Sequence, residues 1–67
     1  MNEELYVTTA AGEAALLERV LKHEGIGCHV EERAMWRGTP FWVVFVACAD
    51  LPRGRELRDS IHWETAQ

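Results

Sequence analysis

The feature that most constrains this chain is a run of seven apolar residues at 41–47, FWVVFVA, in a protein of only 67 residues. Successive side chains of a strand point to opposite faces of a sheet. The run would therefore present two apolar faces: Phe41, Val43 and Phe45 on one side, and Trp42, Val44 and Val46 on the other. A domain this small buries only about 60% of the surface that its unfolded chain exposes. Covering both faces is the main problem that the fold must solve.

A strand and a helix are predicted in the first part of the chain. Residues 5–9, LYVTT, are rich in β-branched and aromatic residues and predict a strand. The segment 10–24 contains no proline and predicts a helix. Thr9 is a candidate cap for its start, and Gly25 ends it, because a left-handed conformation costs little only for glycine. The apolar positions fall on one helical face: Leu16, Leu17, Val20 and Leu21.

Two further strands and a second helix are predicted in the rest of the chain. Apolar and polar residues alternate over 26–32, which is typical of a half-buried strand. The segment 33–40 is a connection, and 41–47 is the third strand. Asp50 is a candidate N-cap of the last helix, which is expected to end between residues 62 and 65. Its buried face comprises Gly54, Leu57 and Ile61.

The order β-α-β-β-α predicts an α+β fold, a ferredoxin-like unit that lacks its last strand. A right-handed crossover makes the first two strands parallel, and the third strand returns antiparallel between them. We expect a single domain, 1–67, with a three-stranded mixed sheet and two helices on one face. The sequence leaves open which face of strand 41–47 meets the helices.

The face of the sheet without helices is the candidate binding surface. At about 25 cal/mol per Å², covering several hundred Å² of it would stabilise the fold by several kcal/mol. A second copy of the chain or a protein partner would supply that cover, unless the connection 33–40 and Trp63 fold over it. The candidate binding residues are Trp36, Arg37, Trp42 and Val44.

No pattern typical of a catalytic, metal or cofactor site is found. Cys28 and His29 are neighbours on a strand, so their side chains point to opposite faces and cannot bind one ion. The cysteines and histidines also lack the spacing of zinc ligands. The arginines of the last helix, with Glu56 and Asp59 nearby, are typical of a solvated face: Arg53, Arg55 and Arg58. We therefore expect a non-catalytic protein without a metal or cofactor.

Charge and hydropathy exclude several kinds of partner. The net charge of −4 argues against binding to nucleic-acid phosphates, which requires clustered lysine and arginine. No apolar run approaches the roughly 20 residues that cross a bilayer. The acidic start of the chain is not followed by a signal-peptide core, and two cysteines are too few for a disulfide scaffold. We expect a cytoplasmic protein with reduced thiols.

Three groups of residues carry a resemblance to a known family. The first helix contains Glu13-Ala14-Ala15-Leu16-Leu17 and ends at Glu24-Gly25-Ile26. The last helix starts within a run that comprises Val46, Asp50, Gly54, Arg55, Glu56 and Leu57. With these residues the chain resembles, over nearly its whole length, a family of short prokaryotic signal-transducing proteins of unknown function. Ala47-Cys48-Ala49 departs from the family pattern, which leaves the start of the last helix open by a residue or two.

The resemblance implies a fold similar to that of the PII-like regulators, which are oligomeric sensors of small molecules. It implies a regulatory role and a possible small-molecule ligand, although no motif names that ligand. Together with the apolar face, it predicts a regulatory binding module that self-associates as a homodimer through a sheet face or edge. The alternative is a monomeric adaptor that docks one protein partner through the same face.

Overall fold

The computed structural model describes residues 1–34 and 38–61 of the chain. The elements are β1 (Asn2–Thr8), α1 (Ala11–His23), β2 (Cys28–Ala34), β3 (Pro40–Ala47) and α2 (Leu51–Ser60), with one 3-10 turn (Cys48–Asp50) before α2. The predicted order of strands and helices is confirmed. The expected end of the last helix at 62–65 is wrong, because α2 ends at Ser60 and Ile61 has an extended backbone.

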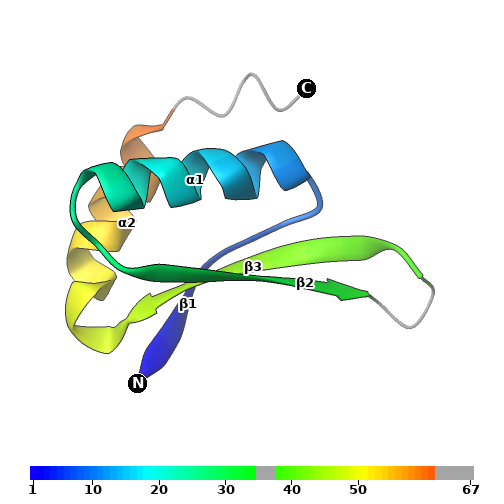
Figure 1. Ribbon diagram of the computed structural model, residues 1–67, viewed down its shortest axis with the longest axis horizontal. Coiled ribbons are helices and arrows are strands. Elements are labelled where there is room, and N and C mark those ends of the chain that lie inside the picture. Colours follow the sequence, from blue (N-terminus) through cyan, green and yellow to red (C-terminus); the bar gives the residue numbers. More distant parts are fainter. Residues whose placement is uncertain (35–37, 62–67) are drawn as a thin grey trace.

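The sheet has β3 in its centre, antiparallel to β1 on one side and to β2 on the other. β1 and β2 run in the same direction, as predicted, but they are not neighbours. Both pairs of neighbouring strands in the sheet are therefore antiparallel. Both helices lie on one side of the sheet, and the other side carries no helix (Figure 1). This is the predicted α+β arrangement, and it is compatible with a ferredoxin-like unit that lacks its last strand.

The hairpin register decides which apolar set of β3 is covered by the helices. Val44 and Val46 are at most 1% exposed and belong to the core, and the half-buried Trp42 packs against it. Their buried partners come from β1, from both helices and from the turn after α1: Leu5, Ala14, Leu17, Leu21, Ile26 and Leu57. The other set, Phe41, Val43 and Phe45, consequently lies on the side without helices, which we call the sheet reverse.

The end of α1 is set by Gly25, as predicted. Its φ is +79°, and its N–H donates to the carbonyl of Lys22 at 3.0 Å. The N–H of Ile26 donates to the carbonyl of Leu21 at 2.9 Å, which completes a Schellman cap. Leu21 and Ile26 are both core residues, so this turn joins the helix to the core.

The start of α1 differs from the prediction, because the threonine whose side chain accepts a backbone hydrogen bond there is Thr8, not Thr9. The N–H of Ala10 donates to Oγ1 of Thr8 at 3.0 Å. The Thr8 hydroxyl in turn donates to the carboxylate of Glu13, which also accepts a hydrogen bond from the Tyr6 hydroxyl at 2.9 Å. The three side chains form a polar cluster that ties the end of β1 to the first turn of α1.

α2 packs closely against β1 through a glycine. A Cβ at Gly54 would lie 3.2 Å from Cδ2 of Leu5, so a larger residue would press on this core leucine. Leu57 is buried on the same helix, and the half-buried Ile61 packs against the core, as predicted. Asp50 occupies the N-cap position of α2, but its side chain makes no capping hydrogen bond.

Candidate binding surface

The sheet reverse carries a central apolar row on β3. Phe41 and Phe45 are half-buried, whereas Val43 is only 1% exposed. Val7 of β1 pairs with Val43 and is 51% exposed. The predicted apolar reverse therefore exists, but only part of it is open to solvent.

A polar row on β2 covers part of this apolar row. The Glu31 carboxylate accepts a hydrogen bond from Nη2 of Arg33 at 2.7 Å and lies 3.1 Å from Nε2 of His29. The guanidinium carbon of Arg33 lies 5.5 Å from the centre of the Phe45 ring. The His29 ring stacks on the same Phe45 ring, with the two ring centres 6.2 Å apart. The side chains of β2 thus shield Phe45 in place of a helix.

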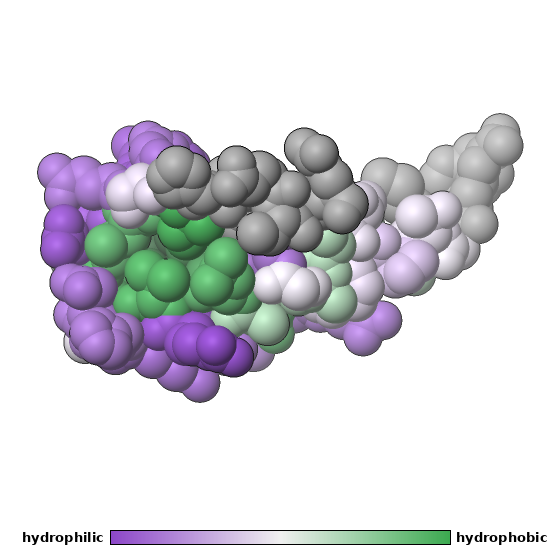
Figure 2. Space-filling view, turned by 90° about the horizontal axis from the view of Figure 1, so that it is seen from above, coloured by the Kyte–Doolittle hydropathy of each residue, from purple (hydrophilic) through white to green (hydrophobic). Residues whose placement is uncertain are grey.

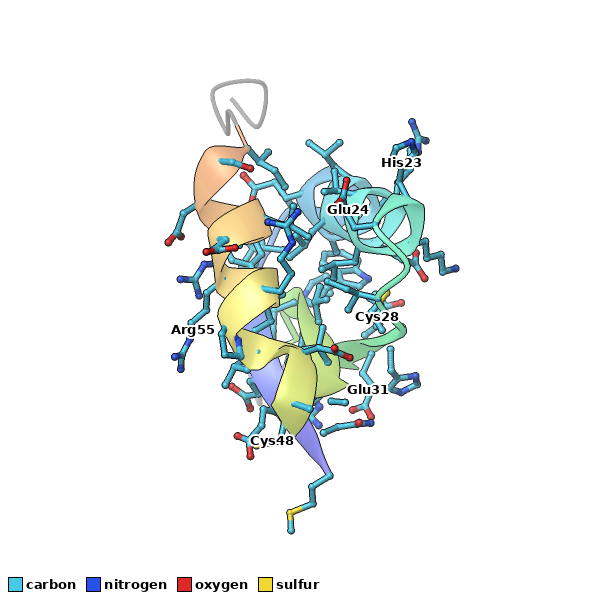
Figure 3. The ribbon with its side chains drawn as sticks, turned by 90° about the vertical axis from the view of Figure 1, so that its left-hand side faces the viewer. His23, Glu24, Cys28, Glu31, Cys48 and Arg55 are labelled. Atoms are coloured by element: carbon cyan, nitrogen blue, oxygen red, sulfur yellow. The ribbon has the colours of Figure 1, made fainter. Side chains whose placement is uncertain are left out.

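Glu31 is the electrostatic centre of that polar row. Its hydrogen bond with Arg33 and the nearby His29 hold the pKa of this carboxyl below its usual value. Glu31 therefore stays ionised, and its contacts fix the carboxylate in one place on the reverse. Figure 3 shows Glu31 at the β2 border of the molecule, away from α2.

The two edges of the sheet differ in how open they are to another strand. β1 has a register shift between Glu4 and Tyr6, and the carbonyl of Leu5 in this bulge accepts a hydrogen bond from Nη1 of Arg58 at 3.0 Å. Bulges and covering side chains hinder the pairing of a further strand. β2 pairs with β3 in one unbroken register from Cys28 to Ala34 and contains no proline. The β2 edge is therefore the more open of the two.

Two of the predicted binding residues do not lie on the sheet reverse. Val44 is 0% exposed and Trp42 packs against the core, so neither lies on the outer face of the sheet where the sequence analysis expected it. Trp36 and Arg37 lie outside the described residues, as does Trp63. Val7 was missed, because the register of β1 against β3, which sets Val7 beside Val43, has no signal in the local sequence.

The cysteines do not gather into a reactive site. Sγ of Cys28 lies 4.0 Å from the carbonyl oxygen of Glu18 on α1, whereas His29 lies on the sheet reverse, as strand alternation predicts. Burial raises the pKa of the Cys28 thiol, which disfavours the reactive thiolate. Cys48 is exposed, beyond the end of β3 (Figure 3). Within 1–34 and 38–61, no three His, Cys, Asp or Glu side chains form a group that would hold a metal ion.

Arg53 and Arg55 of α2 lie on a solvated face, as the sequence predicts, whereas Arg58 is half-buried because it reaches the Leu5 carbonyl. Nη1 of Arg53 lies 3.0 Å from the Glu56 carboxylate, and Nε of Arg58 lies 3.0 Å from that of Asp59. Arg55 points away from the sheet (Figure 3). These exposed pairs contribute little stability, since such ion pairs are worth about 0–1 kcal/mol.

The described surface also has shallow depressions, of which two adjoin apolar residues. One of about 380 Å³ lies next to the β2 edge and is lined by residues that include Gly27, His29, Phe45 and Asp50. The second, of about 200 Å³, is lined by side chains of α1 that include Val20. Figure 2 shows an apolar patch on the helix side, bordered by hydrophilic residues, so the sheet reverse is not the only apolar surface.

No family model, curated protein or solved structure matches this chain. The resemblance to the signal-transducing family therefore stays a prediction. In the part of the chain that the structure describes, neither helix is long and apolar enough to cross a membrane.

Proposed function

We propose that this protein is a small, non-catalytic binding module that works as a homodimer joined through the β2 edge of its sheet. The observation that carries the proposal is the contrast between the two edges. The bulge and Arg58 protect β1, whereas β2 is regular from Cys28 to Ala34. An open, regular edge strand is a template for pairing with another chain.

The regulatory part of the proposal is supported by the sequence resemblance described above. Two observations support a non-catalytic role. The Cys28 thiol has a raised pKa, and Glu31 is engaged by Arg33 and His29. A small-molecule ligand would fit the depression beside Gly27 and Asp50, which adjoins the proposed dimer interface.

The dimer is expected to be weak. Pairing along one edge buries less than the roughly 1,200–2,000 Å² of a stable interface. Association also costs about 4–15 kcal/mol in lost translational and rotational freedom. We therefore expect a dissociation constant in the micromolar range, for which 1 μM corresponds to about −8 kcal/mol.

Sedimentation velocity over protein concentrations from roughly 0.1 μM to 1 mM spans this range. The mean mass should rise with concentration from the 7.7 kDa of one chain towards twice that value. Glu31→Lys should shift the curve to the monomer, because it reverses the charge at the centre of β2. Glu4→Lys is the matched control, since it makes the same charge change on an exposed residue of β1.

A monomer at all these concentrations would refute the homodimer. If that monomer formed a one-to-one complex once a protein partner was added, the adaptor alternative would hold instead. A dimer that Glu31→Lys leaves intact would show that association uses another surface. Circular dichroism of both variants checks that each remains folded.

A further inference from the structure

The charged side chains of β2 favour one way of pairing two copies. We infer that β2 pairs antiparallel with β2 of a second copy in the register that places Val30 opposite Val30. This inference rests on the proposed homodimer and adds its register.

Symmetry limits the possible registers. When a two-fold axis runs perpendicular to the sheet, both copies keep their helices on the same side, and opposed residues share a face. The axis then passes beside one residue, which opposes itself. The strand Cys28–Ala34 allows three registers with substantial overlap, centred on Val30, Glu31 or Glu32.

Two of these registers oppose like charges. Centring on Glu31 gives the longest overlap, but it sets Glu31 against Glu31 and His29 against Arg33. Centring on Glu32 sets Glu31 opposite Arg33 of the second copy, but Arg33 is already paired with Glu31 of its own copy at 2.7 Å. The same register also sets two exposed Glu32 carboxylates directly opposite each other. Like charges in directly opposed positions destabilise a strand pair.

The register centred on Val30 opposes no like charges. On the sheet reverse, His29 of each copy stands opposite Glu31 of the other. Because Arg33 already holds Glu31 at 2.7 Å, the carboxylate is positioned as an acceptor before the copies meet. His29 of the same copy also lies 3.1 Å from this carboxylate, so in the dimer each Glu31 would lie between two imidazole rings. The cross-strand contacts would form without first ordering the Glu31 side chain.

The helix side of the same register is compatible with burial. Val30 is half-buried and packs against the core, so a Val30 pair would continue the apolar layer from one copy into the next. On the sheet reverse, Gly27 stands opposite Arg33 of the second copy. A Cβ at Gly27 would meet no atom within 4 Å, so there is room for a long side chain there.

Disulfide trapping tests the register directly. Directly opposed residues of an antiparallel pair have Cα atoms about 4.5–5.5 Å apart, which suits a disulfide. With both native cysteines removed (Cys28→Ala and Cys48→Ser), single cysteines are placed by Val30→Cys, Glu31→Cys or Glu32→Cys. Each variant is treated with a mild oxidant and its mass is measured without reductant. Circular dichroism confirms that each one folds.

We expect Val30→Cys to form a covalent dimer at least ten-fold faster than the other two variants. Because Glu31→Cys and Glu32→Cys each remove the carboxylate that disfavours their own register, the decisive variant is Val30→Cys. If it fails to trap while Glu31→Cys or Glu32→Cys does, the register is overturned and the homodimer is left standing. If the chain sediments as a dimer but none of the three cysteine variants forms a covalent dimer, the interface lies elsewhere and the inference is also overturned. A chain that is monomeric throughout would refute the proposed function and the register together.

A gain-of-affinity variant provides an independent check. Gly27→Glu would place a carboxylate opposite Arg33 of the second copy, twice per dimer. Two opposite-charge pairs should tighten the dissociation constant by about two- to thirty-fold. The same substitution should have no such effect in the register centred on Glu31, where Gly27 would no longer oppose Arg33. An unchanged dissociation constant would therefore count against the inferred register.

Discussion

Leu17→Ala is the substitution that tests the packing of this fold most directly. Leu17 is 0% exposed on the face of α1 that meets the sheet, and it shares the core with Val44. Leucine-to-alanine changes at such sites cost about 2–5 kcal/mol, because a cavity remains. A core in a chain of this size rarely supplies more than about 3–5 kcal/mol. The variant should therefore be largely unfolded in buffer at 25 °C.

Leu16→Ala is the matched control, since Leu16 precedes Leu17 on the same helix but is only half-buried. Leucine and alanine have similar helix propensities, so the two variants differ mainly in the apolar area that they lose. Half of a buried leucine is worth about 1 kcal/mol. With a slope of about 1 kcal/mol per M, the urea midpoint of Leu16→Ala should fall by about 1 M.

Far-UV circular dichroism during urea titration measures both variants, and all samples must have the same protein concentration, because dimerisation adds to the apparent stability. Leu17→Ala should show no folded baseline until an osmolyte such as trimethylamine N-oxide is added. Equal losses for the two variants would refute the assignment of the buried face of α1.

Three further predictions concern local features. Tyr6 is the only tyrosine, so an absorbance titration reports its ionisation alone. Burial, followed by the hydrogen bond with Glu13, raises the pKa of Tyr6 above 10. Glu13→Gln should lower that pKa. Because the unfolded chain releases this proton first, stability should fall as the pH rises above about 10, which urea titrations at several pH values would detect. Gly25→Ala should cost about 1–2 kcal/mol in thermal unfolding, because its φ is +79°. Cys48 should react with a thiol reagent faster than Cys28, which is half-buried and has a raised pKa, and urea should remove the difference; equal rates in the native protein would contradict the burial of Cys28.

Several features of the fold depend on residues that are close in sequence and could be predicted from them. Gly25 ends α1 because the need for a left-handed residue arises within one turn of the chain. The opposite directions of Cys28 and His29 follow from strand alternation alone. The start of β1 was missed, because Asn2, Glu3 and Glu4 have little intrinsic preference for a strand and join the sheet only by pairing with β3.

The order of the elements, the helix stop at Gly25 and the two apolar faces of 41–47 were determined by the sequence itself. Only the tertiary structure decided which of those faces is covered, because both sets are apolar and a one-residue slip exchanges them. The difference between the edges is likewise tertiary: the bond from Arg58 to the Leu5 carbonyl joins residues 53 positions apart. Contacts of that separation depend on how the whole chain packs, so no local pattern encodes which edge stays open.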